Sequence, residues 1–274
     1  MATAVFFHAH PDDESLSTAG TMALLAEAGH RVVLVVATRG EEGEVVPGVL
    51  ADGEALGDRR TTELHTAADL LGTARVEFLG YRDSGMADSP TNDNPDCFWQ
   101  ADVDRAADRL RAILSNEQPD LLVVYDQNGG YGHPDHIQVH RVGTRWAAAA
   151  GVERVRWVTL NRDAIRETIE SAIASGAADG LAGIGEDLEE RRRRAEEGSF
   201  GSAAADITHA VAVGPFLDRK RAAIATHASQ IPADSFFLSI PAEQFARAFG
   251  TEWFIDPESP RRPGAPFRTD LLAH

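Results

Sequence analysis

The sequence predicts a protein of the α/β class, with a mostly parallel sheet, helices on both faces and a smaller C-terminal α+β portion. Short apolar runs rich in Val and Phe alternate with longer helical patterns in the first half of the chain, and polar side chains follow four of these runs. Strands that alternate with helices indicate βαβ units and a parallel sheet. We expect residues 1–274 to form one domain, with the sheet core in residues 1–160 and a remainder, 161–274, that completes a crevice at the sheet edge.

The predicted strands of the first half are short and apolar throughout, as expected for parallel strands that are buried on both faces. They are Ala4–His8, Arg31–Thr38, Arg75–Leu79, Leu121–Tyr125 and Val155–Thr159. The helices predicted between and after them are Ser15–Ala28, Asp58–Leu71, Ala101–Asn116 and His136–Ala150. Gly29 and Gly72 stand where the first two helices should end, because glycine adopts the left-handed conformation of a helix cap without steric penalty.

The second half of the chain gives a weaker pattern. Ile207–Val213 indicates a strand, Pro215–Ala228 a helix and Thr251–Ile255 a last short strand. The charge-dense run Glu186–Glu197 is typical of a solvated helix face or loop, and the tail Asp256–His274, with four prolines, is expected to wrap the surface.

The composition excludes several classes of function. With 43 acidic residues against 26 basic ones, the net charge is −17, and such a surface repels the phosphate backbone of nucleic acids. Cys97 is the only cysteine, which excludes an internal disulfide and a zinc site built from several cysteines. The N-terminus lacks the features of a signal peptide, and no segment is long and apolar enough to span a membrane. We therefore expect a cytoplasmic protein with a small-molecule substrate and no nucleic-acid or membrane partner.

Chemically reactive side chains follow four of the predicted strands. The four segments are His8–Glu14, Gly40–Glu44, Gly80–Met86 and Asp126–His136. In an open parallel sheet the carboxyl ends of the strands lie along one edge, and ligands bind there. We therefore expect the four segments to converge on one crevice, with His8 packed at the end of its strand.

The first and fourth of these segments carry the residues of a metal site. His10 and Asp13 have the same spacing as His133 and His136, and a proline follows the first histidine of each pair. Hydrolytic zinc sites use three histidine or carboxylate ligands and leave a fourth position for water. The spacing predicts a site with His10, a carboxylate of the first segment and one histidine of the fourth. It does not decide between His133 and His136, or between Asp12 and Asp13.

The remaining groups suit proton transfer. A carboxylate that does not bind the metal can accept a proton from water, and the spare histidine can act as an acid or stabilise an oxyanion. Asp135 is close enough in sequence to orient that histidine and to keep it protonated. A site of two histidines and one carboxylate suits Zn²⁺ and also Fe²⁺.

Two other functions, phosphoester hydrolysis and nicotinamide binding, are less compatible with these segments. Phosphoester hydrolysis usually needs two bridged metals, and basic residues for a phosphate are scarce, with Arg39 and Arg82 the main candidates. Nicotinamide binding requires a glycine-rich turn after the first strand, and here that strand leads into His-Pro-Asp-Asp.

These motifs resemble those of the LmbE or PIG-L family of zinc-dependent N-deacetylases. The resemblance rests on His10–Glu14 (His-Pro-Asp-Asp-Glu) and His133–His136 (His-Pro-Asp-His), in that order, and extends over Ala4–Ala150. It implies a Rossmann-like fold and hydrolysis of the acetyl group from an N-acetylglucosamine that is attached to another group.

The resemblance also implies a role for each residue of the two motifs. The metal ligands match His10, Asp13 and His136, and the general base matches Asp12. The acid histidine matches His133, with Asp135 beside it, and a mobile tyrosine that helps to stabilise the oxyanion matches Tyr131.

Three further segments are similar to one branch of the family, which deacetylates N-acetylglucosaminyl-inositol in mycothiol biosynthesis. They are Gly40–Val45, Arg82–Met86 and Gly129–His133. This similarity implies substrate contacts at Arg60, Asp83 and Met86. The sister branch, the mycothiol-conjugate amidases, typically has proline at the position of Gly132. Deacetylation of a natural-product sugar remains an alternative, and a non-catalytic sugar-binding relative is an alternative of another class.

Overall fold

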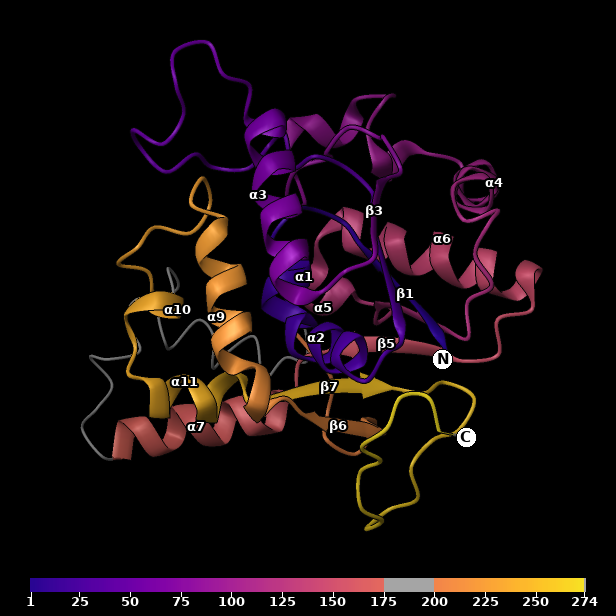
Figure 1. Ribbon diagram of the computed structural model, residues 1–274, viewed down its shortest axis with the longest axis vertical. Helices are drawn as coiled ribbons and strands as arrows, with labels where there is room; N and C mark the ends of the chain where they lie inside the picture. The colour runs from indigo at the N-terminus through magenta and orange to yellow at the C-terminus, as the bar shows by residue number, and fades with distance from the viewer. Residues whose placement is uncertain (175–199, 274) are drawn as a thin grey trace.

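A computed structural model describes residues 1–174 and 200–273 (Figure 1). The charge-dense segment Glu186–Glu197 lies outside the described residues. Among the described residues, no helix is long and apolar enough to cross a membrane.

The centre of the molecule is a sheet in the order β3-β2-β1-β4-β5-β7-β6. The strands are β1 (Thr3–His8), β2 (Arg31–Val36), β3 (Arg75–Phe78), β4 (Leu121–Tyr125), β5 (Val155–Thr159), β6 (His209–Ala212) and β7 (Thr251–Ile255). The first five are parallel, whereas β7 runs antiparallel to β5 and β6. The order 3-2-1-4-5 is that of the Rossmann fold. The predicted parallel core is therefore confirmed, and the antiparallel strands belong to the C-terminal part.

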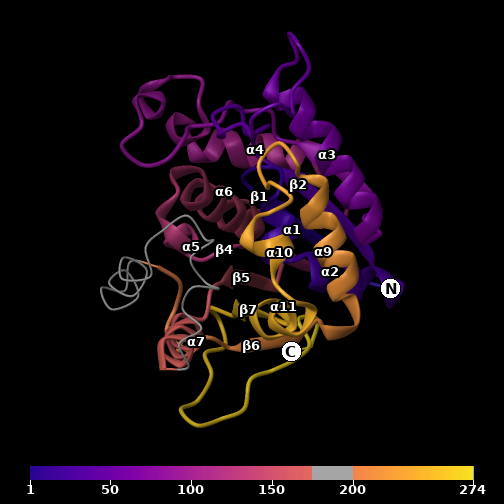
Figure 2. The same cartoon turned by 90° about the vertical axis from the view of Figure 1, so that its left-hand side faces the viewer.

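Helices cover both faces of this sheet, as predicted. On one face α2 (Ala19–Glu27), α3 (Leu56–Leu71) and α9 (Leu217–Thr226) pack against one another. On the other, α4 (Val103–Ile113) packs against α6 (Pro134–Ala150), and Figure 2 shows the sheet between the two groups.

The helix predicted over Ser15–Ala28 is two helices in the structure. α1 (Asp13–Ser17) ends at Thr18, whose backbone leaves the helical region at φ −135° before α2 begins. The Thr18 side-chain oxygen lies 2.8 Å from His8 Nε2. His8 is fully buried, so its expected packing at the end of β1 is confirmed.

Three helices of the C-terminal part were not predicted from the sequence. They are α7 (Arg162–Ala174), α10 (Phe236–Ser239) and α11 (Ala242–Phe249). The last two pack with α9 around a second apolar cluster, made by Ile224, Ile231, Phe236, Ile240 and Phe245. The tail lies along β6, where the backbone of Arg268 bonds to Thr208 and Ala210 at 3.0 and 2.9 Å.

Contact between α6 and β4 fixes the position of the fourth segment. Gly143 of α6 faces Val124 of β4, and a Cβ atom at Gly143 would lie 2.5 Å from Val124 Cγ1. The glycine therefore allows the helix to approach the sheet more closely than any other residue would.

Replacing Gly143 by alanine should lower the melting temperature by several degrees. Overpacking destabilises a core by about 1–3 kcal/mol, which exceeds the gain of about 1 kcal/mol that alanine gives in a helix. Thermal unfolding followed by circular dichroism measures the change. Gly214→Ala is the matched control, since nothing lies within 4 Å of its added Cβ. An unchanged melting temperature for Gly143→Ala would contradict the packing argument.

Candidate active site

The candidate site lies at the carboxyl ends of β1 and β4, which are neighbours in the middle of the sheet. At this position the strand order reverses, and ligands of open α/β sheets bind there. Side chains from distant segments meet as predicted: His10 Nε2 lies 3.1 Å from Asp135 Oδ2 and 3.4 Å from Asp83 Oδ1. The second segment joins them, because the Glu42 N–H donates to Asp83 Oδ2 at 3.1 Å.

His10 is held by carboxylates on both sides of its ring. Nε2 faces Asp135 and Asp83, and Nδ1 lies 3.4 Å from Asp13 Oδ2. Burial lowers the pKa of His10, but these three carboxylates outweigh it and hold the pKa well above its usual value. Carboxylates can only accept, so Nε2 carries a proton. Nδ1 is then the nitrogen at which a metal ion could replace a proton.

His136 has the complementary arrangement. Its Nδ1 lies 3.1 Å from the carbonyl oxygen of Gly129, which can only accept, so Nδ1 carries the proton. The lone pair is therefore on Nε2, which is buried, has no hydrogen-bond partner among the described residues and lies 3.3 Å from Asp13 Oδ1.

Asp13 and the two imidazoles offer donor atoms of the kind that a divalent ion takes in hydrolytic sites. Asp13 lies between the two imidazoles, with Oδ2 toward His10 Nδ1 and Oδ1 toward His136 Nε2. The other nitrogen of each ring contacts an oxygen acceptor: the Asp135 carboxylate for His10 and the Gly129 carbonyl for His136. Ligand histidines in metal sites are usually oriented in this way. Among the described residues, two groups have ligand atoms that all lie within 4.8 Å of one another: His10, His133 and His136, and His10, Asp83 and Asp135. Neither group includes Asp13.

Asp12 lies beside this cluster with its carboxylate toward Arg60. Asp12 Oδ2 is 3.2 Å from Arg60 Nη2. Burial raises the pKa of Asp12 to about 6, with a further contribution from the Asp13 charge, although Arg60 acts in the opposite direction. The Asp12 backbone has φ 108° and ψ −28°, in the left-handed half of conformational space.

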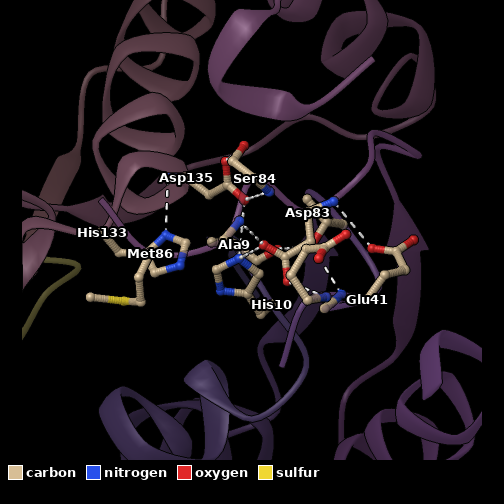
Figure 3. A network of polar contacts seen from close by, with 12 residues as sticks. Ala9, His10, Glu41, Asp83, Ser84, Met86, His133 and Asp135 are labelled. Carbon is tan, nitrogen blue, oxygen red and sulfur yellow. Dashed lines mark hydrogen bonds and ion pairs between the residues drawn. The ribbon is translucent and has the colours of Figure 1, made fainter. Parts of the chain in front are cut away.

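The structure corrects one expectation for His133 and Asp135. Asp135 contacts His133 through its backbone N–H, which donates to His133 Nδ1 at 3.1 Å. Its carboxylate instead contacts His10 and Ser84, as the dashed lines in Figure 3 show. A ring that accepts at Nδ1 is neutral and carries its proton on Nε2. Burial and the neighbouring His10 and His136 also lower the pKa of His133, to about 2, so Asp135 does not keep His133 protonated.

The other predicted residues lie around the same cluster. The Tyr131 ring is 4.9 Å from the His136 ring, between Gly130 and Gly132, which both have positive φ. Met86 is 53% exposed. Asp83 is buried and accepts the Gly85 N–H at 2.8 Å, and Arg60, 4% exposed, donates to protein oxygens.

Three residues without a predicted role also contact the site. The Tyr125 ring stacks on the His136 ring, with centroids 4.1 Å apart and planes 13° apart. The Ser84 N–H and hydroxyl both donate to the Asp135 carboxylate. Glu14 accepts from the Asp12 N–H at 3.0 Å. Tyr125 ends an apolar strand, and Ser84 and Glu14 lie within the segments that follow strands. Their place in the sequence, next to the predicted site residues, was therefore the only indication that they contact the site.

Comparisons with known proteins agree with this fold and these motifs. Residues 5–147 match the PIG-L family, described as GlcNAc-PI de-N-acetylase. A protein of Acidothermus cellulolyticus, named 1D-myo-inositol 2-acetamido-2-deoxy-α-D-glucopyranoside deacetylase, is 44% identical over 259 residues, which are 90% of this chain and 86% of the relative.

Solved structures show the same fold. N,N′-diacetylchitobiose deacetylase of Pyrococcus horikoshii is 20% identical, with 92% of this chain and 82% of that chain covered and a TM-score of 0.55. GalB of Pseudomonas putida, a 4-carboxy-2-hydroxymuconate hydratase, is 19% identical, with 97% and 100% covered and a TM-score of 0.59. Proteins with different activities share this fold, so the structural likeness identifies the fold alone. From the residues matched and the identity to its relatives, the chain belongs to the PIG-L family.

Proposed function

We propose that the protein is a metal-dependent hydrolase that removes the acetyl group from an N-acetylglucosamine-containing substrate, N-acetylglucosaminyl-inositol, and releases the free amine and acetate. The observation that carries this proposal is a carboxylate, Asp12, beside a neutral histidine donor and a cluster of histidine and carboxylate groups that could hold a metal ion. The 44% identity to a relative that is named for this reaction supports the choice of substrate.

His10, Asp13 and His136 are the proposed ligands of a zinc ion, for which Fe²⁺ is an alternative. The lone pair of His136 Nε2 and its 3.3 Å approach to Asp13 Oδ1 support His136 over His133 in this role. When bound, such a metal acidifies water and polarises the amide carbonyl.

Asp12 is the proposed general base. It takes a proton from the attacking water and passes it to the nitrogen of the departing amine, so that one proton leaves water and one arrives on the product. Burial raises the pKa of Asp12 above its ordinary value, which makes this carboxylate a better proton acceptor than an exposed aspartate.

His133 and Tyr131 are proposed to stabilise the oxyanion that forms at the carbonyl. The Nε2–H of a neutral His133 is a donor, and the two rings are 6.3 Å apart. Proton delivery to the amine is assigned to Asp12, because a neutral imidazole is a weak acid.

Arg60, Asp83 and Met86 are the proposed contacts for the sugar, and Arg60 also forms an ion pair with Asp12. Gly132 favours the deacetylase over the related amidases, which typically have proline there. Its φ of 93° is outside the range that a proline ring allows.

Release of primary amine from N-acetylglucosaminyl-inositol, measured with an amine-reactive fluorophore, tests the proposed function. A panel of other N-acetyl sugars and a mycothiol conjugate tests the alternatives in the same assay. Bound metal without amine release from any member of the panel would indicate a sugar-binding protein instead.

Asp12→Asn should reduce kcat by about 10²–10⁴-fold, the usual contribution of a general base, and should leave the bound metal unchanged. Amine release and elemental analysis measure the two effects. Asp88→Asn is the matched control, because Asp88 is the other described non-glycine residue with positive φ and is exposed. Loss of metal from Asp12→Asn would contradict the division of roles between Asp12 and Asp13.

Asp135→Asn should weaken zinc binding by about 10–100-fold, as is typical when the acceptor behind a ligand histidine is changed. Competition with a chromophoric chelator measures the zinc Kd. The control is Asp104→Asn, which changes an exposed carboxylate on α4. Equal zinc affinities for the two variants would show that His10 does not need Asp135 as its acceptor.

A further inference from the structure

The backbone of Asp12 is in an unfavourable conformation. A φ of 108° in a residue with a side chain destabilises the chain by about 1–3 kcal/mol and persists only where the surroundings impose it. The source of that constraint therefore determines where the Asp12 carboxylate lies.

The peptide between Pro11 and Asp12 is held from both sides. The Pro11 carbonyl accepts from Arg60 Nη2 at 2.5 Å, and the Asp12 N–H donates to Glu14 Oε2 at 3.0 Å. Arg60 belongs to α3 and Glu14 to α1. Two bonds on opposite edges fix the orientation of this peptide plane, and with it the φ of Asp12.

Glu14 is itself held by a residue from the C-terminal part. His227 Nε2 lies 2.8 Å from Glu14 Oε1, and the Ser15 hydroxyl donates to the same oxygen at 2.5 Å. Glu14 and His227 are both 0% exposed. The other oxygen of this carboxylate, Oε2, is the acceptor for the Asp12 N–H.

The segment that carries His227 is anchored independently of Glu14. His227 directly follows α9. Two residues later, the Ser229 N–H and hydroxyl donate to the Glu63 carboxylate at 2.9 and 2.6 Å. His227 therefore has a fixed position from which it holds Glu14.

We propose that Glu14 and His227 are positioning residues, which hold the Pro11–Asp12 peptide so that the Asp12 carboxylate is placed for proton transfer. This inference rests on the proposed function, in which Asp12 is the base. Both residues are fully buried, where a substrate does not reach, so their removal should change kcat and leave KM unchanged.

A matched pair of substitutions tests the proposal. His227 Nδ1 has no hydrogen-bond partner among the described residues, so the contacts to be kept or removed are those of Nε2, which lies 2.8 Å from Glu14 Oε1 and 3.2 Å from the Ser15 hydroxyl. Gln places an amide nitrogen near the position of Nε2, whereas Asn is one methylene shorter and does not reach Glu14. His227→Asn should lower kcat by about 10–100-fold, the effect of a displacement of about 1 Å. KM and metal content should stay within about twofold, and His227→Gln should recover most of kcat.

Both variants are assayed well below their melting temperatures. If His227→Asn does not fold, His227→Leu is used in its place. Leucine also removes the hydrogen bond to Glu14, and its larger side chain fills more of the space that the imidazole occupied. Equal kcat values for the folded Asn and Gln variants, or a loss that appears in KM, would overturn the positioning role.

Crystal structures of the parent and of His227→Asn separate this inference from the proposed function. The φ of Asp12 should leave the left-handed region in the Asn variant, whatever substrate the enzyme uses. An unchanged φ overturns the inference even where activity is lost. If the parent releases no amine from any N-acetyl sugar, the proposed function fails. A changed φ would still support the inference that Glu14 and His227 hold the Pro11–Asp12 peptide.

Discussion

The pairing of β1 with β4 is the constraint on which the site depends. These strands are 113 or more residues apart in sequence, since Thr3–His8 pairs with Leu121–Tyr125, and their apolar side chains are buried in the central core. Pairing brings the two histidine motifs together, because each motif begins directly after its strand. Close packing of α6 on β4 at Gly143 then sets the position of Asp135 and His136 relative to the end of β4.

The site gathers charges that would destabilise a core if they were unpaired. Asp13, Asp83 and Asp135 are all less than 10% exposed, and isolated buried carboxylates are strongly unfavourable. Each is compensated by imidazole nitrogens or backbone N–H groups: Asp13 by His10 and His136, Asp83 by Gly85 and Glu42, and Asp135 by Ser84 and His10. This negative environment favours a cation, and it therefore supports the proposed metal site between the two imidazoles.

The C-terminal part contributes to the site through residues that contact the site residues from the protein interior. It adds antiparallel strands to the sheet, and α9 packs on α2 and α3, the helices that follow the first and second segments. Through this packing His227 reaches Glu14, and Ser229 reaches Glu63. Residues of the C-terminal part therefore support the candidate site, although both histidine motifs precede that part.

The sequence by itself determined the parallel core and the residue types of the site. Apolar runs such as Leu121–Tyr125 are stable as strands that are buried on both faces of a parallel sheet. The reactive residues that follow such strands must then meet at one edge of the sheet. Only the tertiary structure decided which ring nitrogens are available, because that depends on acceptors such as the Gly129 carbonyl and the Asp135 carboxylate. It also decided that Asp135 faces His10 rather than His133, and that His227 holds Glu14. Contacts of this kind join residues that are far apart in sequence, and periodicity and spacing report only on neighbours along the chain.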